Sequence, residues 1–160
     1  ALFAALCSVA TMLIHIPIPA TNGYINLGDG VVLLGAFLLG PVYGMAAGGL
    51  GSMLADLLLG YGHYAPGTLI IKGAMALVAA LIFKAFKKNT AGALVGGVAA
   101  EVVMVAGYFG YAALLLGKGI GAAASIPGNL VQAALGLVIG LLLFFLLKRS
   151  KALDKLALGC

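Results

Sequence analysis

Residues 127–149 read PGNLVQAALGLVIGLLLFFLLKR, an apolar run that begins at a proline and ends at two basic residues. A membrane-spanning helix needs about 20 mainly apolar residues to cross a hydrocarbon core about 30 Å thick. Residues 127–147 meet that length, proline is tolerated in the first turn of a helix, and basic residues favour the membrane surface. The run therefore predicts a transmembrane helix.

The rest of the chain has the same apolar character. Apolar residues make up 64% of the 160 residues and charged residues 8%, whereas a soluble domain is about 45–50% apolar and about 25% charged. Nine basic and four acidic residues are too few to cover a surface that faces water. The composition indicates an integral membrane protein and excludes a soluble enzyme, a nucleic-acid-binding domain and a disulfide scaffold.

Prolines, glycines and charged residues divide the chain into six apolar segments. The predicted transmembrane helices are about residues 1–16, 28–39, 41–59, 67–86, 91–116 and 127–147. The second segment is too short to span the hydrocarbon core, so it could form a hairpin with the third that turns below the membrane surface. No repeat or linker separates the segments, and residues 1–160 are therefore predicted to form one all-α membrane domain, a six-helix bundle.

Basic residues predict the orientation of this bundle. Seven of the nine lie between the fourth and fifth segments or after the sixth: Lys84, Lys87, Lys88, Lys148, Arg149, Lys151 and Lys155. Loops rich in Lys and Arg are usually cytoplasmic. With six helices these two regions fall on the same side of the membrane, so both termini are expected in the cytoplasm.

Most polar residues fall in the outer halves of the predicted helices and in the outer loops. The residues predicted to form a substrate site are Asn22, Tyr24, Asn26, Asp29, Asp56, His63, Tyr64, Lys72, Glu101, Tyr108, Tyr111, Asn129 and Gln132. Ionisable groups inside a membrane are costly and normally face a bundle interior or a wet cavity. Because the cytoplasmic half is almost free of polar groups, the pattern favours a cavity for a small polar ligand over a pore.

Structural roles remain open for several of these residues. Asp56 and Lys72 could form an ion pair between neighbouring helices, and Glu101 could be protonated and bonded to another helix. Tyr108 and Tyr111 could be aromatic residues of the membrane interface. No metal-ligand spacing, P-loop or nucleophile elbow is present. We therefore predict no metal, no cofactor and no catalytic residue, and ATP is not expected to be hydrolysed by this chain.

Small residues are the second unusual feature. Glycine accounts for 25 of the 160 residues, against a usual share of about 7%. Small residues four positions apart let membrane helices approach closely. In the first segment Ala1 and Ala5, or Ala4 and Ser8 in a competing register, form such a face, which could contact another membrane protein.

Residues 23–73 carry a set of motifs that resembles a known family. After a Pro-x-Pro, they include GYINLGDGVVLLGAFLLGPVYG and the pattern ADLLLGY…YAP…LIIKG. These motifs resemble the substrate-binding S components of bacterial energy-coupling factor (ECF) vitamin transporters, especially the riboflavin-transporter-like group. The resemblance implies that the chain lies in the bacterial cytoplasmic membrane and captures a small heterocyclic vitamin or precursor from outside.

The same resemblance implies partners. A transmembrane T component would receive the substrate, and two ATPase subunits would supply the energy. The small-residue face of the first helix would dock on the T component, and residues 17–28 would form a lid over the substrate.

Two other classes of function stay open on sequence grounds. Asp29, Asp56 and Glu101 could serve a small intramembrane enzyme, or the chain could act alone as a carrier or channel. A pure assembly scaffold would leave the outer polar cluster unexplained. The substrate is also open among a flavin, a B6 vitamer, a thiamine precursor and other small heterocycles.

Overall fold

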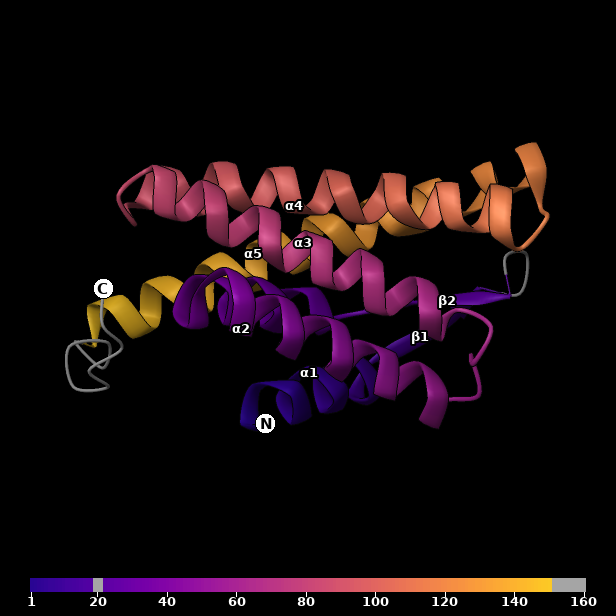
Figure 1. The fold of residues 1–160 in the computed structure, drawn as a ribbon, viewed down its shortest axis with the longest axis horizontal. Coiled ribbons are helices and arrows are strands. Elements are labelled where there is room, and N and C mark those ends of the chain that lie inside the picture. The colour runs from indigo at the N-terminus through magenta and orange to yellow at the C-terminus, as the bar shows by residue number, and fades with distance from the viewer. Residues whose placement is uncertain (19–21, 151–160) are drawn as a thin grey trace.

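The structure is a computed structural model and describes residues 1–18 and 22–150 of the chain (Figure 1). Its elements, in chain order, are α1 (Leu2–Leu13), β1 (His15–Ile18), β2 (Gly23–Asn26), α2 (Gly28–Leu58), α3 (Ala65–Ala85), α4 (Thr90–Gly110), the π-helical turn η2 (Tyr111–Leu115), the 3-10 segment η3 (Gly119–Ser125) and α5 (Ile126–Arg149). The predicted cytoplasmic residues Lys151 and Lys155, and residues 19–21 of the predicted lid, lie outside the described residues.

Helix α2 turns back on itself at Gly40, as Figure 1 shows. Gly40 has a φ of +78°, which glycine adopts readily, and the proline after it has no N–H to continue the helix. A Cβ placed on Gly44 would lie 2.9 Å from Ala36 Cα, and one on Gly48 would lie 3.0 Å from Val32 Cγ1. The two arms of α2 therefore pack closely against each other, and they correspond to the second and third predicted segments.

The predicted count of six separate transmembrane helices is not confirmed. The described residues contain the elements α1 to α5, and α2 consists of two helices joined at the non-helical Gly40. Four helical stretches are long and apolar enough to cross a membrane, namely Gly28–Leu58, Ala65–Ala85, Thr90–Leu115 and Gly119–Arg149. Helix α1 has only 12 residues, shorter than a usual span.

The first helix ends before the predicted boundary at residue 16. Strand β1 begins at His15 and pairs antiparallel with β2, with His15 opposite Asn26 and Ile18 opposite Gly23. Proline disfavours the helical conformation in the residue that precedes it, so Ile16 before Pro17 is extended. The predicted first outer loop is therefore largely a β-hairpin.

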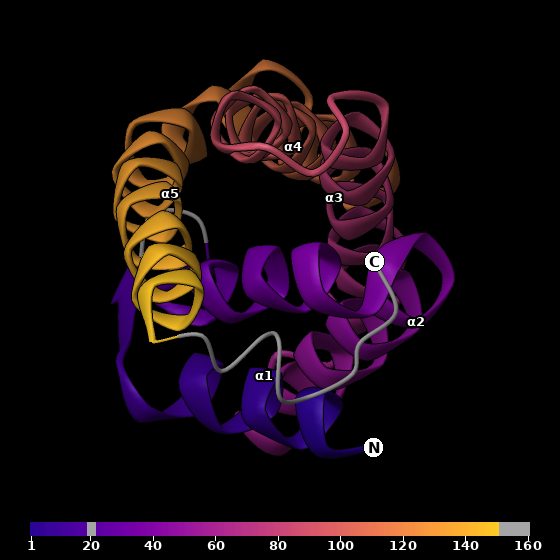
Figure 2. The ribbon, with the colours of Figure 1, turned by 90° about the vertical axis from the view of Figure 1, so that its left-hand side faces the viewer.

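The helices enclose one core in which alanines are mixed with larger apolar side chains. Figure 2 shows α2, α3, α4 and α5 arranged as a ring, with α1 against α2. Ala76, Ala79, Ala100 and Met104 are fully buried in this ring. Large apolar side chains such as Val102 lie instead on the outer surface, as expected where a protein faces lipid.

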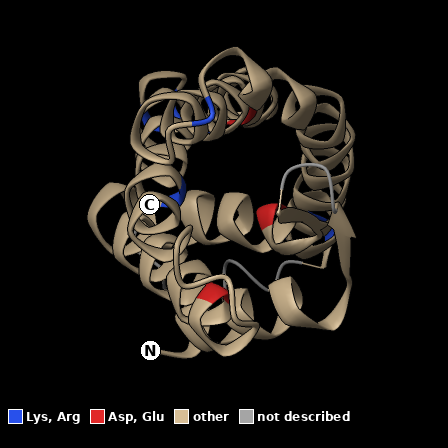
Figure 3. Ribbon diagram, turned by 90° about the vertical axis from the view of Figure 1, so that its right-hand side faces the viewer, with Lys and Arg blue, Asp and Glu red and all other residues tan. Residues whose placement is uncertain are grey.

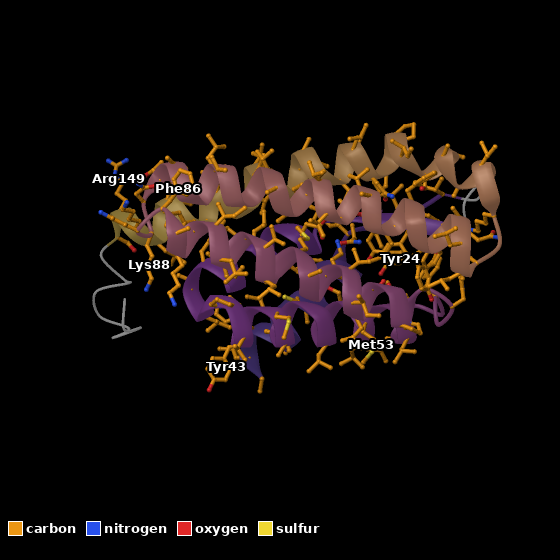
Figure 4. The ribbon with its side chains drawn as sticks, turned by 45° about the horizontal axis from the view of Figure 1, so that its top comes forward. Tyr24, Tyr43, Met53, Phe86, Lys88 and Arg149 are labelled. Carbon is orange, nitrogen blue, oxygen red and sulfur yellow. The ribbon has the colours of Figure 1, made fainter. Side chains whose placement is uncertain are left out.

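The two ends of the bundle differ in charge. Lys88 and Arg149 lie at one end, whereas Tyr24 of the hairpin lies toward the other (Figure 4). Figure 3, viewed from the hairpin end, shows how few charged positions the ribbon carries. The end that carries the hairpin therefore contains the candidate site.

Candidate ligand-binding site

A cavity lies between the β-hairpin and the helices that surround it. Its wall consists of Ile18, Gly23, Tyr24, Asn26, Asp56, Tyr64, Thr68, Tyr108, Ser125, Asn129 and Gln132. Its volume is about 40 Å³, whereas sites for small molecules commonly measure about 300–1,000 Å³. The cavity is therefore narrow, with the hairpin packed close to the helices.

Seven residues predicted from the sequence line this cavity: Tyr24, Asn26, Asp56, Tyr64, Tyr108, Asn129 and Gln132. Sequence reasoning missed Ile18, Gly23, Thr68 and Ser125. Thr68 precedes Lys72 by four residues, a spacing that places both side chains on the same face of α3. The sequence could have identified Thr68 from that spacing. The positions of Ile18, Gly23 and Ser125 at the cavity depend instead on how the hairpin and η3 pack.

Tyr24 and Asp56 join the hairpin to α2. The Tyr24 hydroxyl donates a short hydrogen bond to Asp56 Oδ1, while Asp56 Oδ2 is buried and has no hydrogen-bond partner among the described residues. Burial, reinforced by the nearby Asp56 carboxylate, raises the pKa of Tyr24 above its ordinary value, so the hydroxyl remains a donor. Because a buried acceptor without a donor is costly, Asp56 Oδ2 suits an N–H group of a ligand.

A buried ion-paired network lies behind the cavity wall. Lys72 Nζ pairs with Asp29 Oδ1, and their side chains are 2% and 0% exposed. Gln132 Nε2 donates to Asp29 Oδ2 at 2.9 Å, and Gln132 Oε1 accepts from the Asn26 backbone N–H at 2.9 Å. The ion pair of Lys72 is therefore with Asp29 and not with Asp56. Gln132 links this pair to the cavity, which Asp29 and Lys72 do not line themselves.

Aromatic rings form one side of the site. The Tyr64 and Tyr108 ring centroids are 6.3 Å apart, and Thr68 Oγ1 lies 2.9 Å from the Tyr108 hydroxyl oxygen. Lys72 Nζ is 5.4 Å from the Tyr108 centroid. Tyrosine rings offer flat apolar faces with a polar edge, so this side suits a planar ring that also forms hydrogen bonds.

Like Asp29 and Lys72, three further predicted site residues do not line the cavity, namely Asn22, His63 and Tyr111. His63 Nε2 is 3.3 Å from the backbone oxygen of Asn22, and the Tyr111 hydroxyl donates to the His63 carbonyl oxygen at 2.9 Å. Asn22 and His63 also border a more open hollow at the mouth, beside Tyr61. These contacts tie the hairpin to the α2–α3 loop and to η2.

Glu101 is separate from the cavity. It is 4% exposed, and neither of its carboxylate oxygens has a hydrogen-bond partner among the described residues. It borders an apolar groove between α4 and α5 that includes Val102. A Cβ on Gly136 would lie 2.8 Å from Glu101 Oε1 and 2.5 Å from Asp29 Cβ, so Gly136 leaves room for both acidic side chains.

We expect Glu101→Gln to stabilise the protein. The amide has nearly the same shape as the carboxyl group and removes an ionisable group whose oxygens have no hydrogen-bond partner among the described residues. A buried polar group without partners costs about 1–3 kcal/mol when neutral and more when charged, so the amide removes the part of the cost that the charge adds. Each kcal/mol corresponds to roughly 2–4 °C in the midpoint of thermal unfolding for chains of about this size. The midpoint should therefore rise by several degrees in detergent solution.

Gln132→Glu is the matched comparison for Glu101→Gln, because it makes the opposite change from an amide to a carboxyl group. It places a second carboxyl group against Asp29 and should lower the unfolding midpoint, because it replaces a donor with a like charge. A lower midpoint for Glu101→Gln would show instead that the carboxylate has a stabilising partner.

Residues 1–149 match the family described as "ECF-type riboflavin transporter, S component". The chain is 44% identical over 142 residues to the "Uncharacterized protein in gap 3'region" of Pyrococcus woesei, covering 89% of this chain and 94% of that one. It is 32% identical over 155 residues to the thiamine precursor transporter HmpT of Lactococcus lactis subsp. cremoris (strain MG1363), covering 96% and 88%.

A solved structure has the same fold. It is described as "Structure and mechanism of the S component of a bacterial ECF transporter", with a TM-score of 0.73 and 23% identity, over 92% of each chain. This likeness confirms the predicted fold. The family match and the long apolar helices together indicate a multi-pass membrane protein.

Proposed function

Because the chain belongs to the ECF-type riboflavin transporter S component family, we propose that it is the subunit that captures a small heterocyclic vitamin or vitamin precursor for import. Its family and fold are those of transport subunits, so the alternative of an intramembrane enzyme is set aside. The observation that carries the proposal is the cavity under the hairpin, where the free Asp56 oxygen, three side-chain amides and tyrosine rings converge.

The proposed substrate is a small planar heterocycle that carries an amino group, such as an aminopyrimidine precursor of thiamine. Asp56 Oδ2 would accept a hydrogen bond from the amino group, and the Asn129 amide would pair with ring nitrogens. Tyr64 and Tyr108 would contact the ring. A three-ring flavin fits the narrow cavity less well than a single ring, and one relative is a thiamine precursor transporter.

The hairpin would act as the lid of this site. It closes the cavity through the Tyr24–Asp56 bond and through the Asn26 N–H bond to Gln132. Opening the lid requires these bonds to break, and one ligand donor at Asp56 and another at Gln132 Oε1 would compensate for their loss. Substrate entry is therefore coupled to the position of the hairpin.

Delivery would involve a T component and two ATPase subunits in the cytoplasmic membrane, with the basic end of the bundle in the cytoplasm. Ser8 is buried and its hydroxyl donates to the Gly51 carbonyl oxygen at 2.6 Å, while a Cβ on Gly51 would clash with the Ala4 carbonyl oxygen. The Ala4–Ser8 register thus packs against α2. Ala1 and Ala5 are exposed, which supports them as the register that docks on the T component.

Isothermal titration of the purified chain with an aminopyrimidine thiamine precursor, pyridoxine and riboflavin tests this function. We expect one-to-one binding, tightest for the aminopyrimidine. Proteoliposomes should accumulate it only when the T component, both ATPases and ATP are present. Absence of binding across the panel would overturn the proposal, and uptake by the chain alone would favour an autonomous carrier.

A further inference from the structure

A second hollow lies where α2 turns back, at the end of the bundle opposite the candidate site. It is lined by residues 36–41 of α2, by Ala80, Phe83 and Lys84 of α3, and by Lys88. Its volume is about 190 Å³, several times that of the cavity under the hairpin.

The hollow is apolar on one side and basic on the other. The half-buried residues Leu38, Leu39 and Pro41 contribute hydrocarbon surface, and the two lysines are its charged residues. Neither lysine forms an ion pair or a side-chain hydrogen bond within residues 1–18 and 22–150. The three acidic residues in those ranges lie elsewhere, two of them in contacts at the hairpin end. The hollow therefore combines two lysines that have no acidic partner among the described residues with a surface for a hydrocarbon chain.

The backbone around Lys88 fixes its place beside the hollow. Lys87 and Lys88 have φ values of +52° and +56°, an uncommon conformation for residues other than glycine. The Lys88 N–H donates to the Phe83 carbonyl oxygen at 2.9 Å, and the Lys87 N–H donates to the Lys84 carbonyl oxygen at 3.0 Å. These bonds close the last turn of α3 and bring Lys88 back over Phe83, near Lys84.

We propose that this hollow binds an anionic phospholipid, with one acyl chain against Leu38, Leu39 and Pro41 and the phosphate between Lys84 and Lys88. In a membrane the acyl chain lies in the hydrocarbon core and the phosphate at its boundary, which matches the change from apolar to basic residues at the end of α3. Basic residues near an anionic membrane surface attract it electrostatically. The bound lipid would brace the turn of α2 against α3.

Native mass spectrometry of the protein released from nanodiscs of phosphatidylcholine with phosphatidylglycerol tests this site. We expect Lys84→Gln/Lys88→Gln to reduce retained phosphatidylglycerol at least fivefold. The matched control is Lys148→Gln/Arg149→Gln, which removes the same charge from the same end of the bundle. Lys148 and Arg149 do not line the hollow. The control should retain more than half of the bound lipid.

Four further results decide the proposal. Equal loss in both double variants would overturn it, because it would show general attraction to the basic end. If the protein retains phosphatidylcholine as well as it retains phosphatidylglycerol, the proposed role of the lysines in selecting an anionic lipid would be overturned. Ala80→Leu narrows the hollow while leaving both lysines in place, so it should also reduce lipid retention. Soluble glycerol phosphate should not displace the lipid, because it lacks the acyl chain, and displacement would overturn the lipid assignment in favour of a phosphate site.

Discussion

Lys72→Met is expected to lower the midpoint of thermal unfolding by roughly 6–20 °C. The change leaves the Asp29 carboxylate fully buried without its cation, and removing one partner of a buried ion pair costs about 3–5 kcal/mol. At roughly 2–4 °C per kcal/mol, that loss gives the stated range. Size-exclusion chromatography of the detergent-solubilised protein after heating at a series of temperatures measures the midpoint.

The double variant Asp29→Asn/Lys72→Met separates the uncompensated charge from lost packing. The asparagine that replaces Asp29 is neutral and still offers an oxygen to the Gln132 Nε2 donor. Most of the lost stability should therefore return in the double variant. Lys148→Met, at an exposed position in the last turn of α5, serves as the control and should shift the midpoint little. A single Lys72→Met variant as stable as the wild type would contradict the ion pair.

Asp56→Asn is expected to weaken binding of the aminopyrimidine ligand about 10–100-fold. The asparagine oxygen can still accept from the Tyr24 hydroxyl, but its NH₂ group takes the place of the free Oδ2 acceptor. A hydrogen-bond donor of the ligand would then face the NH₂ donor of the asparagine instead of an acceptor. Hydrogen bonds to a charged group contribute about 1.5–3 kcal/mol, and 1.4 kcal/mol corresponds to a tenfold change in Kd.

Isothermal titration measures this loss, and the unfolding midpoint without ligand shows whether the fold is kept. Tyr111→Phe is the matched control, because its hydroxyl bonds the His63 carbonyl oxygen outside the cavity. It should bind the ligand within about twofold of the wild type. An unchanged Kd for the Asp56→Asn variant would show that Asp56 does not bind the ligand. It would not by itself exclude the cavity as the binding site.

Several features of the fold followed from local composition. The boundaries predicted for the last three helices fall within a few residues of α3, of α4 with η2, and of α5. Their ends are marked by prolines and lysines, signals that act within one turn of a helix. The Gly40–Pro41 step marked the turn of α2 for the same reason. The β-hairpin was missed because a four-residue strand beside prolines carries too weak a pattern.

The sequence by itself determined that the chain is a membrane protein, where its apolar segments lie, and which half of the bundle holds the polar residues. These properties depend on hydrophobicity along the chain, which needs no knowledge of neighbouring helices. Only the tertiary structure decided that Lys72 pairs with Asp29, that Asp56 keeps a free oxygen and that Glu101 lies apart from the cavity. Such pairings depend on how each helix is rotated about its axis. In a membrane both the core-facing and the lipid-facing sides are apolar, so the periodicity that reveals this rotation in soluble proteins is largely lost.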